Sequence, residues 1–301
     1  MFEHFLFLFK RPLTRVFYCK KNRKLHGDTH WIMKLSIITI NRNNAGGLRK
    51  TIESVVSQTF KDFEYIVIDG ASTDNSVDVI KASQTEGLNF MWISEPDGGV
   101  YEAMNKGIKR AKGEYCLFLN SGDYLIAPDV LERVFAQNTS ADIINARCDV
   151  SDNEKVVWKS PYLPKVTLKD LYFVGLPHQS TFIRRALFEQ YGLYREDFRY
   201  NSDIDFWYKA IILGDATTYG VDVIVADYNL DGLSTLNAES EEYKREMDEI
   251  LSQGFLAKVL PDYDQWMKER NVLDKYIWIE EHRCLQKVLN IYRKINKRLS
   301  K

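Results

Sequence analysis

The sequence predicts an α/β protein whose core is a doubly wound, mostly parallel sheet flanked by helices. Two observations predict this fold. Short, continuous apolar runs alternate four times with segments whose apolar residues recur at helical spacing. Within each run, polar residues do not alternate with apolar ones, which is typical of strands buried on both faces of a parallel sheet. Such alternation of strand and helix favours right-handed crossovers between parallel neighbours.

The first half of the chain supplies the regular part of this sheet. The predicted strands are Leu35–Ile40, Tyr65–Ile68, Phe90–Ile93 and Cys116–Leu119. Four helices are expected. The first runs from residue 48 to about 58, the second follows a cap formed by residues 72–74, the third covers 100–111, and the fourth runs from 128 to about 137. Gly113 suits the end of the third helix, and Pro128 suits the first position of the fourth.

The second half is less regular and ends in charged helices. Short strands are expected at Ile143-Ile144, Val156–Trp158, Thr181–Ile183 and Val221–Ala226, and helices at Thr167–Phe173, before Gly192 and at Asp203–Leu213. Beyond Gly232 the pattern is helical over 239–252 and 275–299. We therefore expect a compact domain over residues 33–235 and a C-terminal helical region over 236–301. Basic residues on the last helix form a solvated face or, alternatively, contact anionic lipid.

Composition narrows the function classes. Net charge is −1 over 301 residues, so nothing suggests bulk attraction to nucleic acid. The four cysteines form no CxxC or zinc-type spacing, which favours a reducing cytosol. No apolar run approaches the roughly 18 to 20 residues that span a bilayer. The sequence therefore predicts a cytoplasmic protein that takes no nucleic acid.

The first 32 residues combine a short aromatic run with basic residues that follow it. A signal peptide would carry its basic residues first, so the order argues against one. We expect a poorly ordered extension, or a start of translation placed too far upstream, ahead of a domain beginning at Met33. A membrane-surface anchor is the alternative, which would place the protein peripherally at the inner face of the membrane.

The turn after the fourth strand, Asn120-Ser121-Gly122-Asp123, carries one carboxylate. Open α/β sheets bind ligands at the carboxyl ends of their strands, so we expect Asp123 to lie in a crevice. A carboxylate there is a hard oxygen ligand that suits Mg²⁺ or Mn²⁺. A simple polar turn is the alternative, since all four residues favour turns.

Several common nucleotide and metal sites are missing from the sequence. No GxGxxG follows the first strand, no GxxxxGK[ST] occurs, and the histidines lack zinc-hydrolase spacing. The loop after the first strand is also not the glycine-rich basic loop of a sugar-nucleotide pyrophosphorylase, because Arg42 is its one basic residue.

In combination, four segments resemble family 2 glycosyltransferases of the GT-A fold, and in particular the bacterial branch that builds capsule, colanic acid and O-antigen polysaccharides. The segments are Leu35–Ile40, Val67–Asp74, Glu95–Gly107 and Leu119–Asp123. The resemblance covers roughly residues 34 to 232. It implies an inverting transfer of a sugar from a UDP- or GDP-linked donor to a saccharide or lipid-linked saccharide.

The resemblance also implies roles for individual residues. The positions that match the family's nucleotide-binding residues are Thr39, Asn41, Asp69, Asn105 and Lys106. Asp123 matches the last acidic residue of the DxD-type motif, which binds Mg²⁺ or Mn²⁺ against the diphosphate. Asn120 and Gly122 stand where many members have aspartate, so Asp123 is expected to be the one protein carboxylate on the ion. Solvated surface is the alternative for Lys106.

The segment Tyr200–Trp207 resembles the acidic motif that supplies the catalytic base, with Ser202 in place of the usual glutamate. Asp203 is then the base that removes the acceptor proton, and a helix N-cap is its alternative role. Asp205 is expected to pair with Lys209 instead. His178 and Gln179 match a pair that lines the acceptor pocket; a metal contact or a structural role is the alternative for His178. A non-catalytic partner in a polysaccharide assembly complex remains the alternative function, because the DxD-type motif retains only one of its acidic residues.

Overall fold

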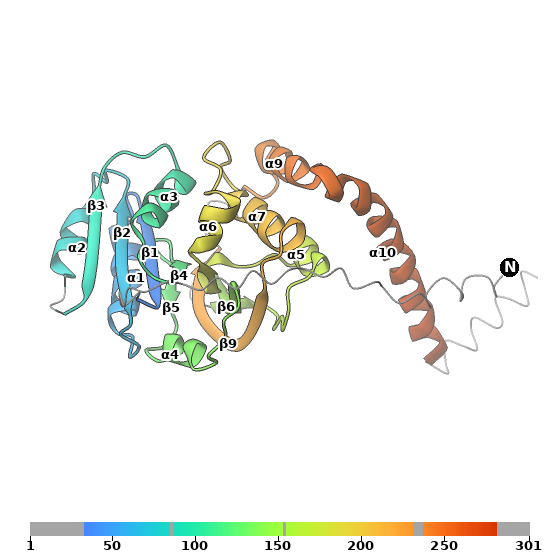
Figure 1. Cartoon of the computed structure of the whole chain (residues 1–301), viewed down its shortest axis with the longest axis horizontal. Helices are drawn as coiled ribbons and strands as arrows, with labels where there is room; N and C mark the ends of the chain where they lie inside the picture. Colours follow the sequence, from blue (N-terminus) through green and yellow to red (C-terminus); the bar gives the residue numbers. More distant parts are fainter. Residues whose placement is uncertain (1–32, 85–86, 153–154, 231–236, 282–301) are drawn as a thin grey trace, which may run out of the picture. The chain divides into compact units, whose positions relative to one another are not determined.

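The computed structural model describes residues 33–84, 87–152, 155–230 and 237–281, and side chains up to residue 270 (Figure 1). The strands are β1 (Leu35–Asn41), β2 (Phe63–Asp69), β3 (Asn89–Ser94), β4 (Tyr115–Phe118), β5 (Tyr124–Leu125), β6 (Ile143–Asp152), β7 (Lys155–Lys159), β8 (Thr181–Arg184) and β9 (Thr218–Asn229). They form one sheet in the order β3-β2-β1-β4-β8-β6-β9-β5, with β7 paired to β6.

The sheet changes character after β4. Strands β3, β2, β1 and β4 are parallel, as predicted. Strand β8 is antiparallel to both β4 and β6, β6 and β9 are parallel, and β5 is antiparallel to β9. The sheet is therefore mixed, and the expectation of mostly parallel strands holds for its first half.

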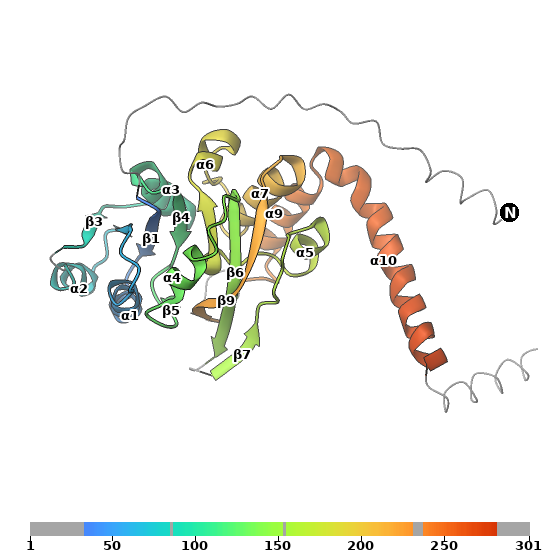
Figure 2. The ribbon, with the colours of Figure 1, turned by 60° about the horizontal axis from the view of Figure 1, so that its bottom comes forward.

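The helices cover both faces of the sheet (Figure 2). They are α1 (Ala45–Val56), α2 (Ser76–Ala82), α3 (Val100–Arg110), α4 (Val130–Phe135), α5 (Leu168–Phe173), α6 (Ala186–Tyr191), α7 (Ser202–Trp207), α9 (Glu241–Leu251) and α10 (Gly254–Glu281), with a 3₁₀ turn η1 (His178–Ser180) and a π-helical turn η2 (Tyr208–Leu213). One apolar cluster joins α1, α2 and α4 to one face; a second joins α3, α5, α6, α7 and α9 to the other.

The parallel register brings polar strand ends together. Asn41, the last residue of β1, lies opposite Asp69, the last residue of β2. Strand β4 pairs with β1 on the other side and ends at Phe118, so the turn at 120–123 emerges at the same edge. This is the edge at which the sequence places its ligand site.

Four elements differ from the prediction in length or bounds. Strands β6 and β9 are ten and twelve residues long, whereas two and six residues were predicted. The helix predicted over 203–213 begins at Ser202 and changes to a π-helix at Tyr208. Helix α10 begins at Gly254, well before the predicted residue 275. The long strands carry isolated polar residues inside the sheet, which interrupted the apolar pattern on which the prediction rested.

Some expectations fall partly outside the described residues. The N-terminal extension, Cys19 and Cys284, and the basic part of the last predicted helix lie there. Within the described residues, Cys116 and Cys148 are buried free thiols. None of the helices in that part of the chain is both long and apolar enough to cross a membrane.

Candidate active site

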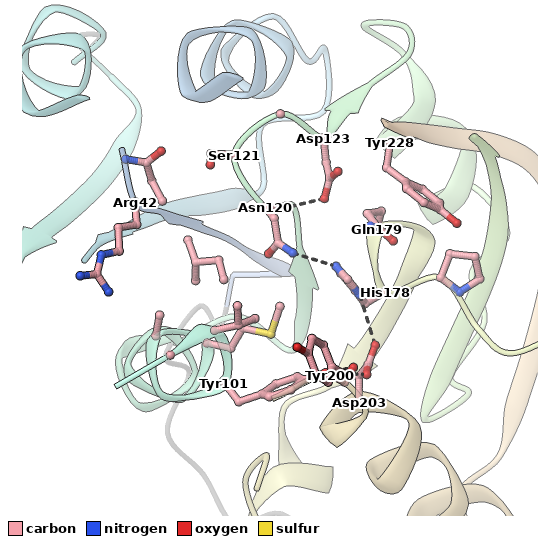
Figure 3. Close-up of a pocket in the computed structure, with 18 of the residues that line it drawn as sticks. Arg42, Tyr101, Asn120, Ser121, Asp123, His178, Gln179, Tyr200, Asp203 and Tyr228 are labelled. Carbon is pink, nitrogen blue, oxygen red and sulfur yellow. Dashed lines mark hydrogen bonds and ion pairs between the residues drawn. The ribbon is translucent and has the colours of Figure 1, made fainter. Parts of the chain in front are cut away.

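A cleft of about 1410 Å³ opens at the carboxyl edge of the parallel strands. Loops from both halves of the sheet line it, together with the N-terminal ends of α1, α3 and α7. The lining includes five of the residues singled out from the sequence, Asn41, Asp123, His178, Gln179 and Asp203. Figure 3 shows His178 between Asn120 and Asp203, with Asp123 and Gln179 beside them.

The turn that carries Asp123 is held against helix α1. The Thr51 hydroxyl donates to the Asp123 carbonyl at 2.7 Å and accepts from the Gly122 amide at 2.9 Å. Asn44, which caps α1, donates to the Ser121 carbonyl at 2.9 Å. Gly122 has a φ of 112°, a conformation that favours glycine over any residue with a side chain. The turn is therefore a built part of the cleft wall.

Burial makes Asp123 electrostatically unusual. Its side chain lines the cleft and accepts the Asn120 amide at 3.1 Å, yet the residue is only 9% exposed. Desolvation raises the pKa of its carboxyl to about 6, with a smaller rise from Asp227. His178, the Asn120 amide and a hydrogen bond from Gln179 act in the opposite direction. A cation in the cleft would stabilise the ionised form.

These residues fit a magnesium-type ion that is bound jointly with a phosphate ligand. Within the described residues, no group of three or more His, Cys, Asp or Glu side chains is placed to hold a metal. Mg²⁺ commonly takes one or two carboxylates and completes its shell with phosphate oxygens and water. Asp123 meets that requirement, whereas a closed zinc-type site does not fit.

Asp203 enters the cleft from the first turn of α7. Its Oδ1 accepts the Tyr101 hydroxyl at 2.9 Å and the Ile204 amide at 3.0 Å, and its Oδ2 lies 3.3 Å from the His178 Nδ1. The N-cap of α7 is Asn201, so the alternative role of Asp203 as the cap is wrong. Asp205 pairs with Lys209, as predicted. Of the two acids, only Asp203 lines the cleft.

Strand order explains why His178 reaches this place. Because β8 runs antiparallel to β4, its start lies beside the carboxyl end of β4. His178 opens the short turn η1 just before β8. Its Nε2 lies 3.2 Å from the Asn120 Nδ2, and its Nδ1 faces Asp203. The turn after β4 and the helix α7 are thus joined through one imidazole.

Two of the predicted nucleotide-binding residues, Thr39 and Asp69, lie behind the cleft wall and not in its lining. Both are fully buried, and the Thr39 hydroxyl is bonded to Tyr65. Asp69 accepts hydrogen bonds from Asn41, Ser72 and Ser94 at 2.6 to 3.0 Å. Burial opposes ionisation of Asp69, but these donors outweigh it and lower its pKa. In this structure its carboxylate braces the ends of β1, β2 and β3, and its contact with a base stays a prediction.

Asn105 and Lys106 likewise support the walls. The Asn105 side chain donates to the Tyr194 carbonyl at 2.8 Å and accepts the Tyr194 amide at 3.1 Å. Lys106 donates to the Pro96 carbonyl at 2.7 Å and lies 3.2 Å from Glu102. Its side chain is 14% exposed, which does not match the solvated-surface alternative. Neither residue is part of the cleft lining, so their nucleotide contacts also stay predictions.

Sequence reasoning missed two acidic residues of this region. Asp227, near the end of β9, lines the cleft and accepts the Ser151 and Tyr124 hydroxyls. Glu246, on α9, is 1% exposed and accepts the backbone amides of Arg199, Tyr200 and Asn201. Asp227 directly follows a predicted apolar strand, and this position could have identified it as a candidate site residue. Glu246 offered a weaker signal: it stands three residues after Tyr243 and four before Ile250, on the apolar face of a helix that is otherwise rich in charged residues.

Glu246 fixes the segment that leads into Asp203, so its loss should affect both stability and turnover. Glu246→Ala leaves three amides at the cleft edge without their acceptor, at a cost of about 3 kcal/mol in the free energy of unfolding. Glu249→Ala is the control, because Glu249 on the same helix makes an exposed pair with Arg195, worth about 0.5 kcal/mol. Urea titrations measure both; equal losses would contradict this role of Glu246.

Comparison with known proteins decides the family. Residues 36–198 match the family described as Glycosyl transferase family 2. The chain belongs to that family. This glycosyltransferase carries Asp123 and His178 inside the matched segment, whereas Asp203 and Glu246 lie beyond it.

Curated relatives agree with the assignment. A PGL/p-HBAD biosynthesis glycosyltransferase of Mycobacterium bovis is 32% identical over 216 residues, which are 70% of this chain and 82% of the relative. An uncharacterized glycosyltransferase of Mycobacterium tuberculosis is 30% identical over 67% of this chain and 77% of its own length.

Solved structures show that this glycosyltransferase has the GT-A-like fold. S. aureus TarS 1-349 in complex with UDP-GlcNAc aligns with a TM-score of 0.55 and 23% identity over 65% of this chain, and the alignment spans 58% of TarS. Mannosyltransferase PcManGT from Pyrobaculum calidifontis, in complex with GDP-Man and Mn²⁺, aligns with a TM-score of 0.51 and 18% identity over 69% of this chain and 60% of its own.

Proposed function

We propose that this glycosyltransferase moves a sugar, with inversion, from a nucleoside diphosphate sugar to a saccharide or lipid-linked saccharide acceptor. One observation carries the proposal: Asp123, in the turn after β4, and Asp203, on α7, line the same cleft and are joined through Asn120 and His178. An inverting displacement needs charge compensation at the leaving diphosphate on one side and a base at the acceptor on the other. The two carboxylates meet those two needs.

The electrostatics of the Asp123 side suit a diphosphate. Arg42 and Lys50 line the cleft together with the first turn of α1, whose backbone amides give it a positive end. A bound Mg²⁺ or Mn²⁺ would offset the charge that builds on the departing diphosphate. Asp123 would hold that ion, and its carboxyl pKa of about 6 would fall when the ion binds.

The electrostatics of the Asp203 side suit proton removal. Asp203 stands at the cleft surface with one oxygen, Oδ1, committed to Tyr101 and Ile204. Burial and the charge of Asp203 raise the Tyr101 pKa well above 10, so the phenol stays a donor. Oδ2 has the His178 contact and a remaining lone pair for an acceptor hydroxyl. Asp203 takes the proton as the acceptor oxygen bonds to the anomeric carbon.

Known relatives bear on donor and pathway. Two structural neighbours are complexes with UDP-GlcNAc and with GDP-Man, which supports a UDP- or GDP-linked donor here. One curated relative is named for PGL/p-HBAD biosynthesis, which supports an acceptor in cell-surface glycoconjugates. We extend this to the capsule, colanic acid and O-antigen class that the sequence resembles, acting at the inner face of the membrane. Two buried free thiols are compatible with a reducing compartment.

The test is a donor screen with purified protein. Wild type and Asp203→Asn are incubated with UDP- and GDP-sugars and Mn²⁺, with and without saccharide acceptors, and released nucleoside diphosphate is measured. We expect one donor to give metal-dependent release that an acceptor accelerates, and a product of inverted anomeric configuration by NMR. If no donor binds and none is cleaved, the chain is instead a non-catalytic partner in an assembly complex.

A further inference from the structure

His178 has both of its imidazole nitrogens engaged. Nε2 lies 3.2 Å from the amide nitrogen of Asn120, and Nδ1 lies 3.3 Å from the Asp203 Oδ2 (Figure 3). The side chain is 18% exposed, so the ring is mostly enclosed by its partners. An imidazole with both nitrogens occupied has no lone pair left for a metal ion.

We propose that His178 is a positioning residue that holds the carboxylate of Asp203 aimed at the acceptor hydroxyl, with Asn120 fixing the imidazole tautomer that this requires. The inference rests on the proposed function and adds a role to it. It differs from the direct acceptor or metal contact that the sequence predicts for His178, which stays a prediction.

The tautomer follows from the amide of Asn120. When Nδ2 of Asn120 donates to Nε2, a neutral imidazole accepts at Nε2 and carries its proton on Nδ1. The proton on Nδ1 then points at the Asp203 Oδ2 and donates to it. The opposite tautomer would set two donors against each other at Asn120 and leave a lone pair facing the carboxylate.

The carboxylate of Asp203 is then held from both sides. Tyr101 and the Ile204 amide donate to Oδ1, and His178 donates to Oδ2. Tyr101 is itself fixed, because its hydroxyl also lies 2.7 Å from the Tyr200 carbonyl. Two donors on one oxygen and one on the other set the plane of the carboxylate. The remaining lone pair of Oδ2 has a defined direction into the cleft.

The same arrangement links the base to the turn that carries Asp123. Asn120 donates its backbone amide to the Asp123 Oδ2 at 3.1 Å and its side-chain amide to His178. Its own Oδ1 is buried without a hydrogen-bond partner. A buried carbonyl oxygen without a partner is costly, and turning the amide over would bring Oδ1 to Nε2 and require a proton there, so the ring tautomer is the quantity to measure. One residue thus orients groups on both sides of the reacting bond.

The chemistry balances without a proton leaving His178. The acceptor oxygen forms its bond to the anomeric carbon as the bond from that carbon to the diphosphate breaks, and the leaving oxygen takes the electron pair. The acceptor proton goes to the Asp203 Oδ2. His178 keeps its Nδ1 proton throughout. Its role is to orient the Asp203 carboxylate and to stabilise the negative charge of that carboxylate through a hydrogen bond.

Three substitutions of His178 separate this role from packing or binding. Asparagine places an amide nitrogen near the former Nδ1, glutamine places one near the former Nε2, and leucine removes both. We expect His178→Leu to lower kcat by roughly 10²-fold, because a misaimed base costs about that much. We expect His178→Asn to retain roughly 10-fold more kcat than His178→Gln. The donor KM and the Mn²⁺-dependent affinity for nucleoside diphosphate should stay near wild type in all three.

The results that overturn the proposal are distinct from failure of the proposed function. Equal losses in the asparagine and glutamine variants, or an unchanged kcat in His178→Leu, would reject the positioning role while transfer itself stands. A loss of Mn²⁺ affinity, measured by calorimetry, would make His178 a metal contact instead. If the wild type transfers no sugar, the proposed function fails first.

A spectroscopic measurement tests the tautomer without turnover. Long-range ¹H–¹⁵N correlation of the His178 ring, recorded at a pH where the ring is neutral, should show Nδ1 protonated and Nε2 unprotonated. In Asn120→Ala the population should move toward the Nε2-protonated form. A wild-type ring protonated at Nε2 would overturn the inference.

Discussion

Replacing Asp203 by asparagine should lower sugar transfer by roughly 10³-fold or more and leave nucleotide binding nearly intact. The substitution keeps the size of the side chain and its contacts to Tyr101 and Ile204, but removes the group that accepts the proton. In the proposed mechanism, the donor binds on the other side of the cleft, around Asp123. The expected signature is therefore a collapse of kcat with little change in donor KM.

Asp205→Asn is the matched control for this change. Asp205 lies two residues further along α7, is 3% exposed and pairs with Lys209 outside the cleft lining. Its asparagine still accepts a hydrogen bond from Lys209, so transfer should stay within about threefold of wild type. Steady-state kinetics of both variants give the comparison. Wild-type turnover by Asp203→Asn would remove Asp203 from the mechanism.

Replacing Asp123 by asparagine should abolish metal-dependent donor binding together with transfer, by roughly 10²-fold or more in kcat/KM. Asparagine cannot supply the charge that holds a divalent ion against a diphosphate. Asp149→Asn is the control: Asp149, on strand β6, is also buried, but it pairs with Lys159 and lies outside the cleft lining. Calorimetric titration with Mn²⁺ and UDP or GDP separates the two. Unchanged Mn²⁺ binding in Asp123→Asn would show that the ion is held elsewhere.

The buried carboxyl of Asp123 should also make the stability of the folded protein depend on pH. Burial raises the pKa of this carboxyl from its ordinary 3.8 to about 6 in the folded protein, so the folded state binds the proton more tightly. Ionising Asp123 therefore destabilises metal-free protein as pH rises from about 4 to 6, by roughly 3 kcal/mol at most. Above that range Mn²⁺ with UDP or GDP should raise the wild-type melting temperature, whereas Asp123→Asn should gain stability without metal and respond little to it. A wild type with no such response would contradict the assignment.

Patterns local in sequence predicted the first half of the fold well. The strands β1 to β4 were predicted because a strand that is covered on both faces of the sheet carries an uninterrupted run of apolar residues. Asp123 and Asp203 were placed correctly at one cleft for a similar reason: each stands at the boundary between an element and a loop. The spacing of four residues also predicted the pair between Asp205 and Lys209 that the structure shows.

Contacts between distant segments were not readable from these patterns. Asp69 stands at a strand end, where a ligand-binding carboxylate is expected. Hydrogen bonds from Ser72, Ser94 and Asn41 instead occupy both oxygens of its carboxylate, and the contacts from Ser94 and Asn41, which are distant in sequence, could not be predicted from local patterns. The antiparallel entry of β8, which brings His178 to Asn120, depends on sheet order. Glu246 looks like a solvated charge until its helix packs against residues 199–201. Tertiary packing decides such cases, and local propensity does not.

The central claim is that one cleft holds a metal–diphosphate at Asp123 and faces it with the base Asp203. A crystal structure of the protein with Mn²⁺ and UDP or GDP tests this most directly, through the anomalous signal of the metal. We predict a single Mn²⁺ peak about 2.2 Å from a carboxylate oxygen of Asp123, with the diphosphate on the ion and Asp203 across the cleft. Mn²⁺ bound away from Asp123, or a diphosphate outside this cleft, would contradict the account.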